Sequence, residues 1–599
     1  MCGIAGAINY SKFNLNSITD SLYHRGPNEQ SSYIHNNIAL IHTRLSIQDI
    51  SHGQQPFHYE NYSIIFNGEI YNHLSLRKDL SEFNFKTTSD TETLLYMYIK
   101  YKEKMFDKLD GMFVFSILDK KLNKLILARD RAGKKPLYLY KDEQSILFAS
   151  ELNSIKAGIE NLSINDNAIE SYLRCGFFFN TFTPYKNVMT IKAGYHYSID
   201  LDSLDIQERK YFDIQTYYNQ PSELSFTDSL NHLDSLLHKS VKDRLESSDL
   251  EVGAFLSGGI DSSLVVAMAS KYKSNLKTFT VKFDGAFDES HLAKLTANKY
   301  GTQHYELPIS MNLKDDIEII LSNYGQPFMD SSAIPSYYVS QEAKKHVTVI
   351  LNGDGADEIF GGYRRYVPTA NGLIDIASKL SFLTKVLPKP HNKQSLYNYG
   401  YRLLSMAKKQ GLDFYLSSTN DIFEDEYKFK DNSINMQMDQ YMRGVNLEPL
   451  SKMLVMDFNM ILFSDLLIKM DIATMSQSLE GRSPFLSKYI LEFAPTLKNK
   501  YKIKGKSTKH ILRELSKKYI PSELITQPKR GFEVPLKEWV EKDLKENIFD
   551  ILNSGSYSSN FVDQKFINGL LDNTINVSSE KRAKMLWTMY CLEVWKKNL

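Results

Sequence analysis

The stretch Ser257-Gly258-Gly259-Ile260-Asp261-Ser262-Ser263 joins a run typical of a buried strand, residues 251–256, to a run with helical spacing, residues 262–272. Two glycines at a strand-to-helix turn let backbone N–H groups converge, and the helix N-terminus and the hydroxyls complete an anion cradle. The stretch therefore predicts a phosphate-binding loop. It lacks the Gly-Lys-Ser/Thr signature of a Walker loop.

The sequence around this loop continues to alternate between strand and helix. Strand-like runs at residues 276–283 and 346–351 alternate with helical runs such as residues 288–300. This alternation is typical of βαβ units on a parallel sheet. From about residue 400 the pattern is mainly helical. We therefore expect an α/β parallel-sheet domain with a helical C-terminal part over residues 225–599.

The first part of the chain has a different pattern. Short alternating or apolar runs predict strands at residues 63–66, 112–117, 124–128 and 145–149. A helix is expected to begin at Ser89-Asp90-Thr91-Glu92, which fits a capping box. We expect a layered α+β domain rich in antiparallel sheet over residues 2–210, and the polar residues 213–223 are the best candidate for a linker.

The composition narrows the class of protein. The chain has 599 residues with 72 Lys and Arg against 71 Asp and Glu, a net charge of +1, so it carries no overall basic field for nucleic acid. Its three cysteines, Cys2, Cys175 and Cys591, are too few for a disulfide scaffold or a four-cysteine zinc site. Neither a signal peptide nor an apolar membrane span is evident. We expect a cytoplasmic protein with no nucleic-acid or membrane partner.

Cys2 is a candidate nucleophile. Removal of Met1 would give it a free α-amine, whose pKa of about 7.7 to 8.0 suits it to accept the thiol proton directly or through one water. The nucleophile and its base would then belong to one residue. The alternative is that Cys2 is a small buried residue at the start of a strand.

A second group of polar residues, Asn352-Gly353-Asp354-Gly355-Ala356-Asp357-Glu358, follows the strand-like run 346–351. Together with Asp261 it brings four acidic side chains into two loops, which repel one another unless cations or hydrogen bonds offset the repulsion. Mg²⁺ bridging phosphate oxygens is the natural partner. The alternative is a solvated acidic loop.

The motifs near the start of the chain resemble, in order, the glutaminase domain of class II glutamine amidotransferases. They are Cys2, His24-Arg25-Gly26-Pro27, Arg44-Leu45-Ser46-Ile47, Asn67-Gly68-Glu69-Ile70-Tyr71-Asn72 and Ser89-Asp90-Thr91-Glu92. The resemblance implies an N-terminal-nucleophile fold in which Cys2 attacks the glutamine amide. It also implies an oxyanion hole at Asn67 and Gly68, with Arg44 on the substrate carboxylate and Glu69 and Asp90 on its ammonium.

The phosphate-binding loop resembles the PP-loop of ATP pyrophosphatases, and with four later motifs it resembles the synthetase domain of the glutamine-dependent asparagine synthetase family. Those motifs are Leu466-Leu467-Ile468-Lys469-Met470-Asp471, Ser478-Leu479-Glu480-Gly481-Arg482-Ser483-Pro484-Phe485-Leu486, Lys504-Gly505-Lys506 with Lys509-His510-Ile511-Leu512-Arg513, and Gln527-Pro528-Lys529-Arg530-Gly531-Phe532. The implied fold is the PP-loop, adenine nucleotide α-hydrolase-like fold.

The same resemblance implies roles for individual residues. ATP would bind at Leu256, Ser257, Gly258, Gly259, Asp261, Ser262, Val281, Asn352 and Gly353. Asp261 and Asp357 would carry Mg²⁺, Asp354 would take part in forming an acyl-adenylate, and Lys506 would stabilise developing negative charge. The implied partners are glutamine, ATP and aspartate or another small carboxylate, with a homodimer expected from the family.

Three positions depart from the family pattern, and they leave the acceptor open. Asn28 replaces the usual Asp after Arg-Gly-Pro, Asp354 stands where Glu is frequent, and Ser487 replaces the Asp after Pro-Phe-Leu. A relative that amidates another carboxylate, such as a sugar uronate or a peptide side chain, is the main alternative. A β-lactam-forming enzyme, a nucleic-acid-modifying PP-loop enzyme and a catalytically silent scaffold are less favoured.

Overall fold

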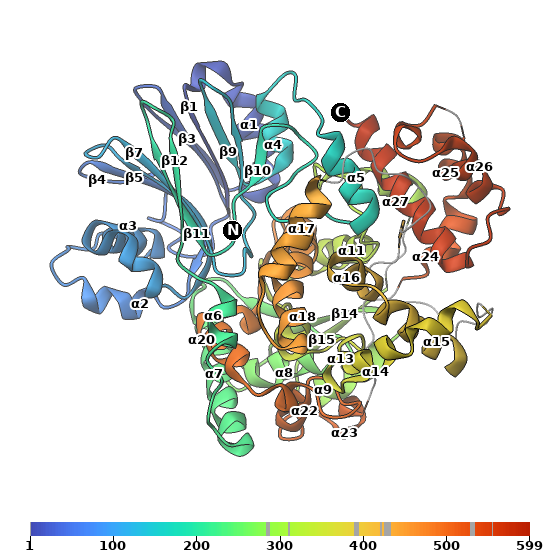
Figure 1. Ribbon diagram of the computed structural model, residues 1–599. Helices are drawn as coiled ribbons and strands as arrows, with labels where there is room; N and C mark the ends of the chain where they lie inside the picture. Colours follow the sequence, from blue (N-terminus) through green and yellow to red (C-terminus); the bar gives the residue numbers. More distant parts are fainter. Residues whose placement is uncertain are drawn as a thin grey trace.

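Two six-stranded antiparallel sheets and one five-stranded parallel sheet organise the chain (Figure 1). This computed structural model describes residues 2–282, 288–308, 312–388, 395–419, 422–423, 433–526, 534–553 and 555–599. The motif at residues 527–532 and the last residue of the expected strand 276–283 lie outside the described residues.

The two antiparallel sheets contain the first twelve strands, in the orders β10-β8-β9-β1-β3-β2 and β12-β11-β7-β6-β5-β4. Their bounds are β1 Gly3–Ile8, β2 Glu29–His35, β3 Ile38–Arg44, β4 Phe57–Tyr59, β5 Tyr62–Ile70, β6 Gly111–Asp119, β7 Lys124–Arg129, β8 Tyr138–Lys141, β9 Ile146–Ala149, β10 Val188–Thr190, β11 Tyr195–Asp200 and β12 Ile206–Lys210. The four strands predicted from alternation correspond to β5, β6, β7 and β9, and the layered antiparallel architecture is confirmed.

The sheets pack face to face because their strands alternate. In β1, Ile4 and Ile8 point into an apolar layer between the sheets, whereas Ala5 and Ala7 belong to a different cluster that includes Ile18 of helix α1 (Leu15–Ser21). Helices α1 and α4 (Leu152–Gly158) lie on one sheet and α3 (Asp90–Tyr101) lies on the other. The order of layers is helix, sheet, sheet, helix (Figure 1).

The cap of α3 differs in part from the prediction. Ser89 is the N-cap, and its hydroxyl accepts from the backbone N–H of Thr91 at 3.2 Å. Glu92 does not complete a capping box with Ser89; its carboxylate accepts the backbone N–H groups of Lys86 and Thr87, at 2.9 and 2.7 Å. The preceding loop therefore uses the glutamate to satisfy its own backbone.

The expected linker at residues 213–223 contains a helix. Helix α6 (Ile214–Tyr218) begins at Asp213, whose side chain accepts from the backbone N–H of Gln215. Ile214 and Tyr218 are spaced four residues apart and are buried on one face. This apolar pair, within an otherwise polar stretch, explains why the connection packs against the protein.

The second part of the chain has a parallel sheet in the order β15-β14-β13-β16-β17, as the alternation predicted. Its strands are β13 Val252–Phe255, β14 Lys277–Lys282, β15 Gln303–Pro308, β16 Val349–Leu351 and β17 Glu480–Arg482. The helices around it include α7 Phe226–Glu246, α8 Ile260–Ala269, α9 Ser290–Tyr300, α10 Leu313–Ser322, α11 Ala333–Lys344, α12 Ala356–Phe360, α19 Leu467–Met475, α20 Lys488–Phe493, α22 His510–Ser516 and α27 Ser579–Lys597. Apolar clusters cover both faces of this sheet.

Strand β17 lies in the region expected to be helical. It pairs in parallel with β16, so that Gly481 faces Ile350 and Arg482 faces Leu351. Its side chains Glu480 and Arg482 are fully buried and form an ion pair at 2.6 Å. A strand of three polar residues has no alternation of hydrophobicity, so only tertiary contacts identify it.

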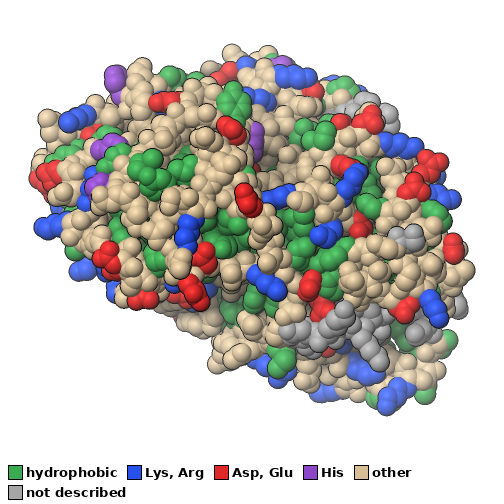
Figure 2. All heavy atoms as spheres, turned by 90° about the horizontal axis from the view of Figure 1, so that it is seen from above, with side chains coloured by type: hydrophobic (Ala, Val, Ile, Leu, Met, Phe, Trp, Pro, Cys, Tyr) green, Lys and Arg blue, Asp and Glu red, His purple; other side chains and the backbone are tan. Residues whose placement is uncertain are grey.

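The surface agrees with the charge balance. On the face drawn in Figure 2, basic and acidic side chains are interspersed. None of the helices within the described ranges is both long enough and apolar enough to span a bilayer.

Candidate active site

The first centre is built around Cys2, which lies just before β1 and is 8% exposed. Its backbone nitrogen donates to Asn67 Oδ1 at 3.1 Å, and its carbonyl accepts from Arg25 Nε at 3.2 Å. The amide nitrogen of Asn67, Nδ2, is buried and has no hydrogen-bond partner among the described residues. A buried donor without a partner is costly in a folded protein, so this N–H group is suited to a bound oxyanion.

Gly68 follows Asn67 in β5 at a place where only glycine fits. Its φ of +152° is disfavoured for other residues, and a Cβ atom there would lie 2.1 Å from the carbonyl oxygen of Met112 on β6. The close approach of β5 to β6 therefore fixes the backbone beside Cys2. The two predicted oxyanion residues lie together with the predicted nucleophile.

The Cys2 thiol is subject to opposing influences. Burial raises its pKa, while a hydrogen bond from the backbone of Leu45 and the positive charge of Arg44 oppose the rise. The guanidinium of Arg44 donates to the carbonyl oxygens of Asp49 at 2.7 Å and Ile50 at 3.2 Å. Arg44 therefore shapes the loop after β3 and places a buried cation near the thiol.

Glu69 of β5 and Asp90, the first residue of α3, form a buried acidic pair. Burial raises the pKa of Asp90 to about 7, against the lowering effect of the backbone N–H of Ile70, which it accepts at 2.8 Å. Burial also raises the pKa of Glu69, although Arg482 lies 3.1 Å from its Oε1. Oε2 of Glu69 has no hydrogen-bond partner in the described part of the chain, so the pair is suited to a ligand ammonium group.

Arg482 links this centre to the parallel sheet. It belongs to β17, 413 positions after Glu69, and its other partners are Glu480 and the carbonyl oxygens of Arg244 and Ser247. Arg482 lies in the motif at residues 478–486, and the sequence pattern alone indicates no role for it. Its signal is the burial of an arginine between two glutamates, which only the fold reveals.

The second centre is the loop between β13 and α8. The hydroxyls of Ser257 and Ser262 lie 2.9 Å apart, and the Ser257 hydroxyl accepts from the N–H of Gly259 at 3.2 Å. Gly353 approaches the loop so closely that a Cβ atom would lie 3.2 Å from Cβ of Asp261. The predicted loop residues therefore meet the segment 352–358, and Leu256, Val281 and Asn352 are buried.

Asp261 and Asp357 meet at one lysine. The ammonium of Lys509 lies 2.5 Å from Asp261 Oδ2 and 2.6 Å from Asp357 Oδ1, and its side chain is 3% exposed. Gly362 packs on the pair, since a Cβ atom there would lie 1.7 Å from Asp357 Oδ1. Lys506, the lysine named from the sequence, is exposed. The structure therefore brings Lys509, rather than Lys506, to the two carboxylates.

The carboxylates remain suited to a divalent cation. Oδ1 of Asp261 is buried and has no hydrogen-bond partner among the residues described. The described residues hold no cluster of three or more His, Cys, Asp or Glu able to bind a metal on their own. Two carboxylates plus phosphate oxygens and water fit Mg²⁺, which is usually bound in this way at nucleotide sites.

Asp354 lies at the edge of this centre. Its Oδ2 accepts from Asn352 Nδ2 at 2.7 Å, from the Ser483 hydroxyl at 3.4 Å and from the ammonium of Lys134 at 3.0 Å. Burial, followed by the charge of Asp357, raises the pKa of the neighbouring Glu358 to about 7, and Glu358 accepts from the Tyr363 hydroxyl. The segment therefore contains acidic groups in different environments.

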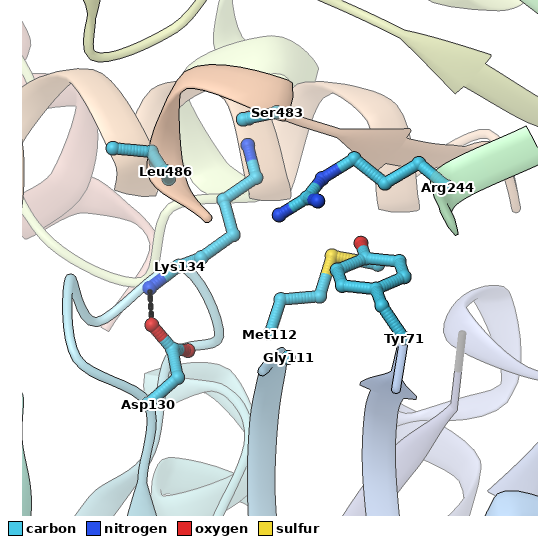
Figure 3. A pocket seen from close by; sticks show the side chains of 8 residues that line it. All are labelled: Tyr71, Gly111, Met112, Asp130, Lys134, Arg244, Ser483 and Leu486. Atoms are coloured by element: carbon cyan, nitrogen blue, oxygen red, sulfur yellow. Dashed lines mark hydrogen bonds between the residues drawn. The ribbon is translucent and has the colours of Figure 1, made fainter. Parts of the chain in front are cut away.

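A cavity lies where the two parts of the chain meet (Figure 3). Its lining residues are Tyr71, Gly111, Met112, Asp130, Lys134, Arg244, Ser483 and Leu486. Met112 contacts Gly68 at one side, and Lys134 and Ser483 contact Asp354 at the other. The cavity therefore lies between the Cys2 centre and the Asp354 centre.

Buried ion pairs hold the two parts together beside this cavity. Arg25 pairs with Glu151 at 2.6 Å and with Asp471 at 2.9 Å, and Lys135 also reaches Asp471 at 2.8 Å. All four side chains are at most 2% exposed. Pairs of this kind give little net stability, but loss of one partner leaves an uncompensated buried charge, so the relative position of the parts is well defined.

Two departures from the family pattern have local explanations. The side-chain oxygen of Asn28 accepts the backbone N–H of Ser46 at 2.9 Å, a role that needs an acceptor and no charge. Ser487 is fully buried and makes no side-chain cap for α20. Instead, Asp110 from the first part of the chain accepts the backbone N–H of Lys488, the first residue of α20, at 2.8 Å.

Comparisons with known proteins agree with this arrangement. Residues 1–212 match the glutamine amidotransferase domain, and residues 232–597 match the asparagine synthase family. Asparagine synthetase [glutamine-hydrolyzing] 1 of Bacillus subtilis is 31% identical over 99% of this chain and 96% of its own length. Asparagine synthetase [glutamine-hydrolyzing] 3 of the same organism is 29% identical over 89% of this chain and 87% of its own length.

A less similar relative has a different name. Amidase chry2 of Gibberella zeae is 26% identical over 94% of this chain and 91% of its own length. The asparagine synthase match covers more than half of the residues and includes the parallel sheet with its glycine-rich loop. The amidotransferase match covers the part of the chain that contains Cys2. The chain belongs to the asparagine synthase family, with a glutamine amidotransferase domain preceding its synthase domain.

Proposed function

We propose that this protein is a glutamine-hydrolysing asparagine synthetase, in which ammonia made at Cys2 amidates aspartate activated by ATP. The observation that carries the proposal is a cavity between the two domains whose lining residues reach both centres: Met112 lies against Gly68, and Lys134 pairs with Asp354. A sheltered route has a chemical purpose, because ammonia released into neutral water is mostly ammonium, which has no lone pair for attack.

At the first centre, the Cys2 sulfur attacks the side-chain amide carbon of glutamine. The carbonyl oxygen becomes an oxyanion beside Asn67 Nδ2 and the N–H of Gly68, ammonia leaves, and a thioester remains for water to hydrolyse to glutamate. Arg44 binds the substrate carboxylate, and Glu69 and Asp90 bind its ammonium. Among the described residues, Nδ2 of Asn67 and Oε2 of Glu69 have no hydrogen-bond partner, which supports these roles.

At the second centre, the acceptor carboxylate attacks the α-phosphorus of ATP and pyrophosphate leaves, so that an acyl-adenylate forms. Ammonia then attacks the activated carbonyl carbon, and AMP leaves. The N–H groups and hydroxyls of residues 257–262 bind phosphate oxygens, while Leu256, Val281, Asn352 and Gly353 surround the nucleoside. Asp354 is near the reacting carboxylate.

The acidic pair and its lysine have separate roles. Asp261 and Asp357 would hold Mg²⁺, which would neutralise charge on the phosphates. Lys509 is the cation that the geometry favours for stabilising the charge that develops during adenylation, because it is buried between the two carboxylates. The exposed Lys506 is the alternative named from the sequence.

A substrate assay tests the proposal. With glutamine, ATP and Mg²⁺, aspartate is expected to yield asparagine, glutamate, AMP and pyrophosphate in comparable amounts. Other carboxylates, including uronates and peptide side chains, are tested as alternative acceptors in the same assay. If aspartate gives no product while another carboxylate does, the protein is an amidotransferase for that acceptor and the asparagine assignment is wrong.

Glutamine is expected to bind more tightly as the pH rises from 6 to 8. Asp90, with a pKa of about 7, must lose its proton before it can accept from the substrate ammonium, which stays protonated over this range. The ionised fraction of such a group rises about tenfold over two pH units centred on its pKa. Calorimetry on Cys2→Ala, which cannot turn glutamine over, should show a dissociation constant that falls up to about tenfold.

The matched control is Cys2→Ala combined with Asp90→Asn, whose amide does not titrate. Its dissociation constant should be higher at pH 8 and vary less with pH. An equally steep pH dependence in both proteins would contradict the role of Asp90.

A further inference from the structure

Lys134 belongs to the amidotransferase domain, yet its ammonium lies against a carboxylate of the synthase domain. Its Nζ is 3.0 Å from Oδ2 of Asp354, a residue 220 positions later in the chain. The Lys134 side chain is only 3% exposed, and that of Asp354 is 18% exposed. A contact so shielded from water is strengthened by the low local dielectric.

The loop that carries Lys134 is held firmly. The carboxylate of Asp130 accepts the backbone N–H groups of Ala132 at 3.1 Å, Lys134 at 2.9 Å and Lys135 at 3.0 Å. Figure 3 shows the Lys134 side chain rising from this loop along the cavity toward Ser483. The amidotransferase domain therefore sets where the ammonium lies.

The other groups around Asp354 make the ammonium of Lys134 its strongest described partner. The other two donors to its Oδ2, Asn352 and Ser483, are neutral. Among the residues that the structure describes, Lys134 is its one ion-pair partner. Hydrogen bonds between charged groups are roughly twice as strong as those between neutral ones, so Lys134 has the greatest influence on the orientation of the carboxylate.

We propose that Lys134 is a positioning residue for the synthase reaction, which acts across the domain interface by orienting Asp354 at the end of the interdomain cavity. The inference rests on the proposed function, since it takes Asp354 to lie beside the acceptor. Because the lysine comes from the domain that hydrolyses glutamine, the amidation site is complete only when the two domains are docked.

The test uses Lys134→Met, which keeps the length and apolar stem of the side chain and removes its charge. Synthesis driven by ammonium salts should lose about 10- to 100-fold in kcat, as expected for a hydrogen bond between charged groups. Glutamine hydrolysis without ATP should stay within about twofold. Lys134→Arg, which retains the charge, should recover most of the synthesis.

A double-mutant cycle separates positioning from a general effect on structure. If Lys134 acts through Asp354, Lys134→Met should cause little further loss in an Asp354→Asn background. Lys135→Met is the matched control, because Lys135 lies on the same loop and pairs with Asp471 instead. Its effect should combine with that of Asp354→Asn by simple multiplication.

The outcomes are distinct. A wild-type protein that forms no amide from any acceptor contradicts the proposed function itself. An active wild type whose Lys134→Met variant synthesises at the normal rate contradicts only the present inference. The inference is also overturned if the losses caused by Lys134→Met and Asp354→Asn multiply fully in the double variant. Failure of Lys134→Arg to recover synthesis overturns it as well.

Discussion

Cys2→Ala is expected to abolish glutamine-dependent synthesis and to leave synthesis from ammonium salts nearly intact. Loss of the attacking sulfur removes the thioester route, and loss of a nucleophile of this kind costs at least about 10⁴-fold in turnover. The substitution is small, and Cys2 directly precedes β1, in which Ala5 and Ala7 are already alanines. Within the described residues the backbone of Cys2 bonds to Asn67 and Arg25 of the amidotransferase domain, so the synthase centre should keep its structure.

Two measurements check this expectation. Glutamate release should fall to background, while ammonium-driven formation of AMP and amide should stay within about twofold of the wild-type rate. Asn67→Ala is an informative companion, because it keeps the thiol and removes the Nδ2 donor, which has no partner in the described part of the chain. Hydrolysis should fall by about 10²- to 10³-fold. Loss of the ammonium-driven reaction in Cys2→Ala would contradict the assignment of two separate centres.

The sequence predicted the sheets well where hydrophobicity alternates and poorly where function interrupts the alternation. The predicted strand at residues 63–66 lies inside β5, Tyr62–Ile70, which continues through Asn67, Gly68 and Glu69. Those last residues break the apolar pattern because they build the candidate glutamine site. β5 continues to Ile70 because β6 supplies hydrogen-bond partners along its whole length.

Contacts between distant parts of the chain could not be predicted from the motifs alone. Glu69 and Arg482 occur in two separately recognisable motifs, but nothing in either stretch indicates that they meet at 3.1 Å. Lys134 lies outside the motifs that resemble the family, and its partner Asp354 is 220 positions away. Such pairs depend on how the domains dock, which local periodicity and turn chemistry do not encode.

The choice between Lys506 and Lys509 shows the same limit on a smaller scale. Both lysines occur in one short motif, and residue type alone cannot distinguish them. The turn at Gly505, with φ of +58°, leaves Lys506 exposed, whereas Lys509 directly precedes α22 and reaches inward. Lys506 and Lys509 are only three positions apart, yet the first side chain is in solvent and the second lies between two carboxylates.

Lys509→Met is expected to reduce synthesis from ATP by about 10³-fold, from glutamine and from ammonium salts alike. The ammonium of Lys509 is the buried cation nearest to Asp261 and Asp357, and preorganised charge at a phosphoryl or acyl centre accounts for effects of this size. Its removal also leaves two carboxylates facing each other without their lysine, which weakens nucleotide binding at low Mg²⁺. Formation of AMP and pyrophosphate is the direct measurement.

Lys506→Met is the matched control, since it makes the same change three residues earlier at an exposed position. It should lower adenylation by no more than about threefold, in keeping with the small effects of most surface substitutions. Both variants should retain glutamine hydrolysis without ATP, which shows that the amidotransferase domain is folded. If Lys506→Met is the more damaging of the two, Lys506 moves to the nucleotide during the reaction, and the role assigned here to Lys509 is wrong.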